Sequence, residues 1–230
     1  LISNNLRLHN KSFNLFNQKK CKNDNNFIDQ GFINSNRYVS THQKSNQIIL
    51  MIGNQTCPGA SCEYLPLKVL ESHLSYGMSS VLFKLFREKN GLTYDVGVFN
   101  PFRKNNSPFL IYLSVSNKNA LLAFKILSEL WQILLSSLIS DNEINLAKTK
   151  LKSSFLISKQ NLDEILQRKI QLIGYELDPD FDMNCLSKIN DINSEDILRT
   201  TNKYLAKPFL SIYGDPKICN EIYKVWIKNF

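Results

Sequence analysis

The sequence predicts an α+β domain in which helices cover a mostly antiparallel β-sheet. Segments with the rhythm of strands come early in the chain, at residues 37–43, 47–55, 94–98 and 108–116. Helical patterns fill the middle, and one late strand, at 207–215, is followed by a closing helix. Strands and helices that occur in separate runs are typical of an α+β sandwich.

The predicted strands differ in their surroundings. The string QIILMIGNQ, residues 47–55, is an apolar run bounded by polar residues, which is typical of a central strand. The string RYVSTHQ, residues 37–43, suits an edge strand. Residues 94–98 and 108–116 share an alternation of apolar with polar or small residues. We therefore expect these two segments to pair as an antiparallel hairpin.

Helical periodicity accounts for most of the remaining chain. A helix is predicted over 63–74, and a second helix follows Gly77, with Ser79 and Ser80 as its N-caps and Gly91 as its stop. The later helices are expected at 118–137, after Ser140, at 162–175, at 182–190, at 194–205 and from Pro216 to Phe230. The string SDNE at Ser140 resembles a capping box, and Ser194 is the expected cap of its helix.

Length and composition suit one large domain that follows a less ordered segment. The chain has 230 residues, of which 43% are apolar, and this length can bury a full core. Residues 1–34 are rich in asparagine and lysine without an apolar rhythm, so we expect a flexible linker or arm. The folded domain is expected to span residues 35–230. Because the first residue is Leu1, we expect the chain to be a piece of a longer protein.

The charge pattern does not favour nucleic-acid binding. The formal net charge is +8. Residues 1–46 account for +5 of it, and residues 47–230 for only +3. No arginine-rich stripe is interleaved with aromatic residues. We therefore expect no nucleic-acid partner.

The cysteine pattern indicates a reducing compartment, for which the cytoplasm is the expected location. The five cysteines form no paired C-x-x-C array, which favours free thiols. Cys57 and Cys62 are open to interpretation as a zinc half-site or a redox pair, but we prefer small loop thiols because no second pair of ligands accompanies them. Residues 121–138 are apolar but interrupted by charged residues, so we expect a buried helix in a soluble protein and no membrane span.

No metal site or nucleophile is predicted in this chain by itself. The histidines, His9, His42 and His73, are few and scattered. Glu71 lies two residues from His73 on a predicted helix, so the two side chains point to different faces. The motifs H-E-x-x-H, H-x-x-E-H and G-x-S-x-G are all absent. We therefore expect no cofactor in this chain and no catalytic residue that acts alone.

The stretch FREKNGLTYDVGV, residues 86–98, holds the two candidate site residues. Arg87 lies in the predicted last turn of a helix, and Tyr94 lies at the start of a strand. An arginine in that position complements the helix dipole. A tyrosine at a strand start can bury its ring and keep its hydroxyl in water. Spacing alone therefore favours a structural role for both residues.

The longer string MSSVLFKLFREKNGLTYDVGV, residues 78–98, resembles the motif of the pitrilysin/insulinase (M16) metallopeptidase family. That motif contains a serine, a Leu-Phe pair, the string R-E-K-x-G-L-x-Y and an alternating strand. The order of predicted elements over residues 37–230 also follows the family. The resemblance implies the mitochondrial-processing-peptidase-like metallohydrolase fold, a two-layer sandwich with a mostly antiparallel sheet.

The resemblance also implies a function. Members of the family are built from paired homologous domains that enclose a chamber. One domain typically binds zinc through H-x-x-E-H and a distant glutamate, and the other supplies an arginine and a tyrosine to the substrate. This sequence lacks the zinc motif and has Arg87 and Tyr94 at the matching positions. It therefore resembles the non-metal half, a peptidase M16-like non-catalytic domain over residues 35–230.

Several expectations follow from that assignment. Arg87 and Tyr94 are expected to bind the substrate backbone and to stabilise the transition state, with the peptide added as a strand at a sheet edge. Zinc is expected in a homologous partner half, either an upstream domain or a separate subunit. We expect a large exposed apolar or mixed surface where that half docks, and the isolated fragment is a candidate homodimer. The alternative is an inert structural or scaffold subunit derived from the same family.

Overall fold

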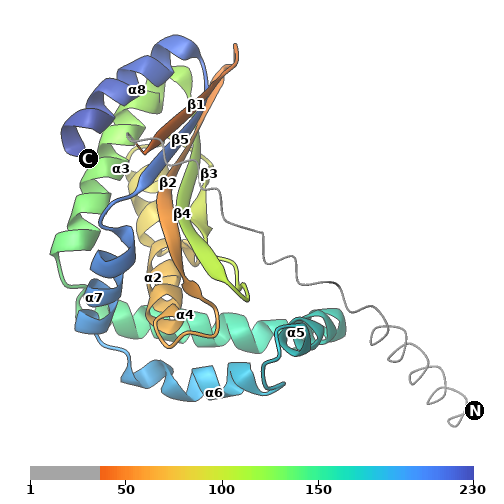
Figure 1. Ribbon diagram of the computed structural model, residues 1–230. Coiled ribbons are helices and arrows are strands. Elements are labelled where there is room, and N and C mark those ends of the chain that lie inside the picture. Colours follow the sequence, from red (N-terminus) through yellow and green to blue (C-terminus); the bar gives the residue numbers. More distant parts are fainter. Residues whose placement is uncertain (1–36) are drawn as a thin grey trace, which may run out of the picture. The chain divides into compact units, whose positions relative to one another are not determined.

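The computed structural model describes residues 37–230, which form one five-stranded sheet with helices (Figure 1). The strands are β1 (Tyr38–His42), β2 (Gln47–Pro58), β3 (Asp95–Phe99), β4 (Asn106–Ser116) and β5 (Phe209–Gly214). Their order in the sheet is β1-β5-β2-β4-β3. The predicted arm, residues 1–34, lies outside the described residues.

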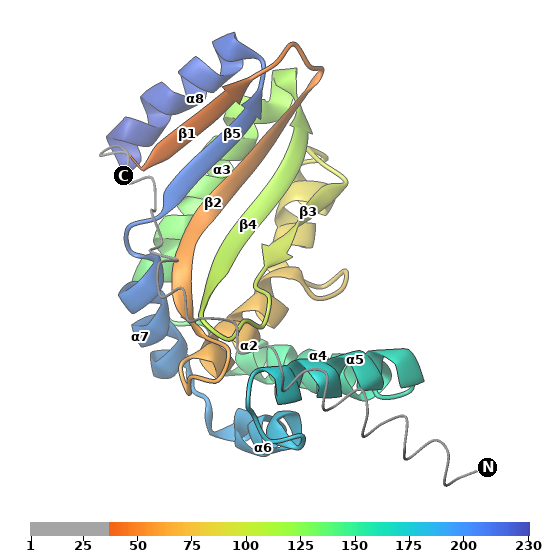
Figure 2. The ribbon, with the colours of Figure 1, turned by 45° about the vertical axis from the view of Figure 1, so that its right-hand side comes forward.

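The pairing of the strands confirms the predicted sheet. β1 runs parallel to β5, and the pairs β2–β5, β2–β4 and β3–β4 are antiparallel. The predicted central strand is β2, the predicted edge strand is β1, and the predicted hairpin is β3–β4. The second edge of the sheet is β3 (Figure 2).

The helices lie behind the sheet and beyond one end of its strands (Figure 2). They are α2 (Tyr64–Ser75), η1 (Phe83–Lys89), α3 (Asn117–Ser136), α4 (Asp141–Ser158), α5 (Leu162–Gly174), α6 (Phe181–Lys188), η2 (Ile189–Asp191), α7 (Ser194–Leu205) and α8 (Pro216–Asn229). Of these, α2, α3 and α8 cover one face of the sheet, while α4, α5 and α6 lie past the end of β2 and β4. This arrangement is the expected α+β sandwich.

Burial alternates along the strands, so the sheet has one covered face and one open face. On β2 the side chains of Ile48, Leu50 and Ile52 are completely buried against the helices. The intervening Ile49 and Met51 are 37% and 41% exposed. Successive side chains of a strand point to opposite faces, and an antiparallel sheet can leave one face uncovered. The covered face forms the core of the domain.

The described helices are short or polar relative to a membrane span. No single helix within residues 37–230 is long and apolar enough to span a bilayer. The helices α3 and α4 meet the limits of length and composition only as a pair, and they are bent by 103° relative to each other.

The helix caps confirm one sequence prediction and correct another. Ser140 and Glu143 form the predicted capping box at the start of α4. At the start of α7 the cap is not Ser194, as predicted, but Asn193, whose side chain accepts from the N–H of Asp196. Asn193 has the extended backbone of a cap, and an asparagine is as effective there as a serine. The Ser194 hydroxyl instead donates to the carbonyl oxygen of Ile139 at 2.7 Å.

The segment after Gly77 is wound differently from the prediction. Residues Phe83–Lys89 form a π-helix. Two α-helical residues, Val81 and Leu82, precede the π segment, and the carbonyl oxygen of Ser80 accepts from the N–H of Lys84 at 3.0 Å. The helical winding therefore begins directly after Ser80, so that Ser80, and not Ser79, stands in the cap position. The predicted stop is confirmed, because Gly91 has a φ of +56°. Glycine adopts that left-handed conformation at little cost.

Candidate functional site

The end of η1 and the start of β3 bring the two candidate residues together. Arg87 lies in the last turn of η1, and Tyr94 directly precedes β3. The Cζ atom of Arg87 is 5.1 Å from the centre of the Tyr94 ring. It is also 4.9 Å from the centre of the Phe83 ring, one turn earlier on η1. Distances below about 6 Å permit cation–π attraction, so the guanidinium group is in contact with two aromatic rings.

Hydrogen bonds fix the backbone between these elements. The side-chain amide of Asn90 donates to the carbonyl oxygen of Leu85 at 2.8 Å. The N–H of Leu92 donates to the carbonyl oxygen of Phe86, also at 2.8 Å. Both bonds satisfy carbonyl groups that a helix end would otherwise leave without a partner. The direction in which the chain leaves η1 is therefore set locally.

The start of β3 is held by Thr93, a buried residue. Its hydroxyl oxygen accepts from the N–H of Asp95 at 3.0 Å, and the same hydroxyl donates to the carbonyl oxygen of Ser114 on β4. Tyr94 lies between Thr93 and Asp95, so its backbone is anchored on both sides. Its side chain is nevertheless 87% exposed.

The polar atoms of this pair are available to a ligand. Across residues 37–230, neither the Arg87 guanidinium nor the Tyr94 hydroxyl has a hydrogen bond or an ion pair with another residue. A guanidinium carries five N–H donors in a planar fork, and a phenol can donate one more hydrogen bond. Aromatic stacking orients the arginine without using any of these donors.

A sheet edge begins beside the pair. Within the described residues, β3 pairs only with β4, so its outer edge has no strand partner (Figure 2). Such an edge presents backbone N–H and C=O groups that can pair with another extended chain. Arg87 and Tyr94 therefore lie at the entry to an edge that can accept an added strand.

The described residues do not fit a metal site. No group of three or more His, Cys, Asp or Glu side chains within residues 37–230 is placed to hold an ion. The Cys57 thiol is buried and Cys62 is exposed, and neither joins such a group. Burial lowers the pKa of His73, which favours its neutral form.

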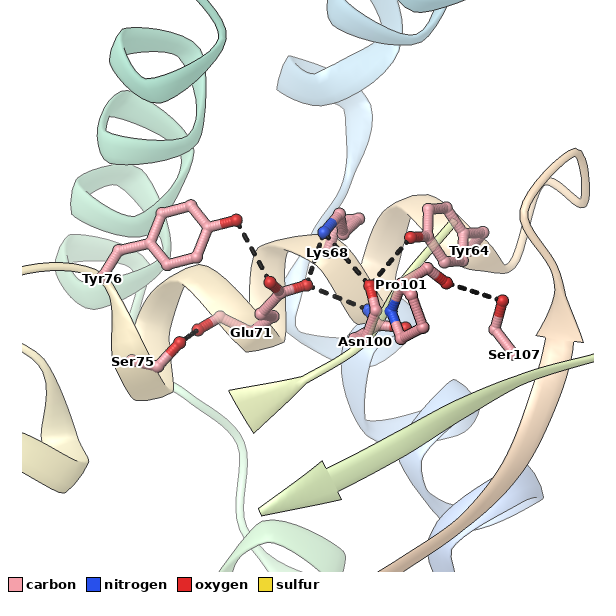
Figure 3. Close-up of polar contacts among 8 residues, drawn as sticks. All are labelled: Tyr64, Lys68, Glu71, Ser75, Tyr76, Asn100, Pro101 and Ser107. Atoms are coloured by element: carbon pink, nitrogen blue, oxygen red, sulfur yellow. Dashed lines mark hydrogen bonds and ion pairs between the residues drawn. The ribbon is translucent and has the colours of Figure 1, made fainter. Parts of the chain in front are cut away.

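Glu71, the buried carboxylate of α2, is committed to a network of side chains (Figure 3). Its Oε2 atom accepts from Lys68 Nζ at 2.7 Å and from Asn100 Nδ2 at 3.1 Å, and its Oε1 atom accepts from the Tyr76 hydroxyl at 3.2 Å. Burial and the nearby carboxylate raise the pKa of Tyr76 well above its ordinary value, so this phenol keeps its proton. Asn100 also ties the network to Tyr64, whose hydroxyl donates to its carbonyl oxygen.

A large cavity lies elsewhere, between the start of α2 and the helices α4 to α7. Its volume is about 1080 Å³, and neither Arg87 nor Tyr94 lines it. Two arginines in its wall are already paired with carboxylates. Arg168 makes a two-point contact with Asp182, and Arg199 pairs with Asp196. We therefore place the candidate site at the unpaired donors of Arg87 and Tyr94 and not in this cavity.

Two contacts, one in the candidate site and one in the Glu71 network, were not predicted from the sequence. Phe83 contacts the guanidinium group, and the signal for that contact was its spacing of four residues from Arg87 on a helix. Glu71 was considered only as a metal ligand, and its partner Asn100 comes from a loop 29 residues away. Helix spacing cannot indicate a contact of that range.

The chain was compared with protein families and curated proteins. The model of the family described as "Peptidase M16 inactive domain" matches residues 5–151. A protein of Rickettsia felis (strain ATCC VR-1525 / URRWXCal2), named "Uncharacterized zinc protease", is 28% identical over 197 residues. A protein of the same name from Rickettsia bellii (strain RML369-C) is 26% identical over 189 residues. The matches cover 84% and 78% of this chain but only 46% and 45% of those relatives, so the chain spans about half of their length.

Solved structures share the fold. The peptidase M16 inactive domain from Pseudomonas fluorescens superimposes with a TM-score of 0.68 at 19% identity, over 77% of this chain and 43% of that one. A protease from Helicobacter pylori also gives 0.68, at 18% identity, over 76% of this chain and 43% of that one.

Proposed function

The chain belongs to the family of peptidase M16 inactive domains, and from that premise we propose that it is the half of a zinc endopeptidase that does not bind the metal. Arg87 and Tyr94 bind the backbone of a peptide substrate and stabilise the transition state of its hydrolysis. The zinc belongs to a homologous half, an upstream domain or a separate subunit. When bound there, it supplies an activated water and polarises the scissile carbonyl group.

One observation carries this proposal. The Arg87 guanidinium contacts two aromatic rings while its hydrogen-bond donors have no partner in residues 37–230. The Arg87 side chain is exposed, so these donors are accessible to the backbone carbonyl oxygens of a bound peptide. Donors that are oriented in advance and aimed at a developing negative charge lower the barrier without reorganisation.

The free edge of β3 suggests how the peptide is held. An extended peptide that pairs with β3 gains main-chain hydrogen bonds along Asp95–Phe99. Its backbone then continues toward Tyr94 and Arg87, the residues before the strand. The phenol and the guanidinium donate to carbonyl oxygens of the peptide there. Binding of this kind depends on an unfolded or extended segment more than on particular side chains.

Exposed apolar surfaces support pairing with a second half. The open face of the sheet exposes Ile49 and Met51, and one side of α5 exposes four aliphatic residues, Leu162, Leu166, Ile170 and Ile173. Soluble monomers rarely expose apolar patches of this kind without a partner. Because the chain spans about half of its curated relatives, the homologous half is the partner that we propose for these surfaces.

Photo-crosslinking from position 94 tests whether this end of the chain contacts substrate. The chain carrying Tyr94→p-benzoylphenylalanine is assembled with the zinc-bearing half, stripped of metal with a chelator, and illuminated with fluorescein-labelled β-casein. We expect a crosslink between the chain and casein. The same substitution at Glu221 on α8 is the control, because α8 packs beside β1 at the other edge of the sheet. Equal crosslinking from both positions, or none from position 94, would contradict substrate contact and favour the scaffold alternative.

A further inference from the structure

Phe83 has a position that the core of the domain does not explain. It is the first residue of η1 and follows Leu82, whose side chain is buried. The residue after it, Lys84, and the residue four positions on, Arg87, are both exposed. The Phe83 side chain is only half-buried and does not belong to the packed core cluster of residues 37–230. The ring therefore has a face that the core does not occupy and that is available to a neighbouring side chain.

The group that contacts this ring is the Arg87 guanidinium. Its Cζ atom lies 4.9 Å from the centre of the Phe83 ring and 5.1 Å from the centre of the Tyr94 ring, so both rings are within range of a cation–π contact with Arg87. An exposed arginine side chain otherwise samples many rotamers, and a ligand that binds it must order them. The contacts with the rings of Phe83 and Tyr94 restrict the rotamers of the Arg87 side chain before the substrate binds.

The winding of η1 contributes to this placement. All seven residues from Phe83 to Lys89 are in π-helical conformation, and both Phe83 and Arg87 lie within that segment. Such winding is rare and is found mostly at functional sites. The bonds from Asn90 and Leu92 to the carbonyl groups of Leu85 and Phe86 hold its end. The two side chains are therefore set against each other by an ordered backbone.

We propose that Phe83 is a positioning residue that acts through Arg87. Its ring holds the guanidinium against Tyr94, so that the free N–H donors face the edge where the peptide binds. This inference rests on the proposed function of Arg87. The ring does not touch the substrate, and its effect depends on the π face and not on apolar bulk alone.

The test compares two substitutions that keep bulk but differ in aromaticity. In the enzyme assembled with its zinc-bearing half and assayed on fluorescein-labelled β-casein, Phe83→Leu is expected to lower kcat/KM about fivefold, whereas Phe83→Tyr keeps the wild-type value. The loss is expected in the same parameter that Arg87→Ala changes, either as a lower kcat or as a higher KM. In an Arg87→Ala background, Phe83→Leu is expected to have no further effect. Equal losses for Leu and Tyr, no loss for Leu, or an undiminished loss without Arg87 would each overturn the proposal.

A second measurement separates this inference from the proposed function. The rate at which phenylglyoxal modifies Arg87 in the chain itself is followed by mass spectrometry, with the exposed Arg103 as internal reference. Phe83→Leu is expected to speed modification of Arg87 relative to Arg103, and Phe83→Tyr is not. An unchanged ratio in Phe83→Leu would overturn the positioning role. If Arg87→Ala leaves activity intact while the ratio responds as expected, the proposed function fails and the contact between ring and guanidinium stands.

Discussion

Arg87→Ala is expected to lower kcat/KM roughly 10² to 10³-fold in the enzyme assembled from this chain and its zinc-bearing half. The guanidinium presents several N–H donors that no residue in the described part of the chain uses, and it is oriented by the rings of Phe83 and Tyr94. Removal of an oriented donor that faces developing charge removes stabilisation of the transition state. Loss of the side chain also removes a contact to the substrate backbone. The measurement is steady-state hydrolysis of fluorescein-labelled β-casein.

Two further variants sharpen this prediction. Tyr94→Phe removes a single hydroxyl that is fully available to a ligand, and we expect a smaller loss of about tenfold. Arg103→Ala is the matched control, because Arg103 is an exposed arginine on the loop between β3 and β4. It is expected to leave kcat/KM unchanged. If Arg87→Ala and Tyr94→Phe behaved like Arg103→Ala, the proposed role of the pair would be wrong.

Lys68→Met is expected to destabilise the domain by about 3 kcal/mol, as measured by urea unfolding. The Lys68 ammonium is 2.7 Å from the Glu71 carboxylate, and the side chains are only 26% and 9% exposed. Without the lysine, the carboxylate keeps Tyr76 and Asn100 as donors but loses its counter-charge. A buried charge without its partner costs far more than the pair contributed.

The controls for this prediction use a second ion pair and a double variant. Lys104 pairs with Glu176 at 3.2 Å, but these side chains are 49% and 84% exposed. Lys104→Met is therefore expected to cost less than about 1 kcal/mol. The double variant Lys68→Met/Glu71→Leu is expected to regain much of the lost stability, because no unpaired charge remains. A Lys68→Met variant as stable as Lys104→Met would show that the network is not held by charge.

Local patterns in the sequence were sufficient to predict most elements of the fold. A short apolar run bounded by polar residues indicated β2, and the alternation of apolar with polar or small residues indicated the β3–β4 hairpin. The capping box of Ser140 and the left-handed Gly91 depend on neighbouring residues only, and both predictions were confirmed. Signals that act over a few residues are visible without knowledge of the tertiary structure.

Other features depend on contacts that a local pattern does not contain. The parallel pairing of β1 with β5 joins segments about 170 residues apart, and nothing in either strand specifies its neighbour. The π winding of η1 was predicted as an ordinary helix, because the apolar spacing of Leu82, Leu85 and Phe86 suits both. In the candidate site, the family motif pointed to Arg87 and Tyr94, whereas their stacking required the turn at Gly91 to bring them together.

The central claim is most directly tested by the zinc content and peptidase activity of this chain, alone and after mixing with its zinc-bearing half. We expect the chain alone to hold no stoichiometric zinc and to leave fluorescein-labelled β-casein intact. The mixture is expected to hydrolyse casein, to lose that activity on chelation and to regain it when zinc is restored. Zinc and activity in the chain alone would contradict the account. So would a mixture that stays inactive although its partner half is loaded with metal and bound to this chain.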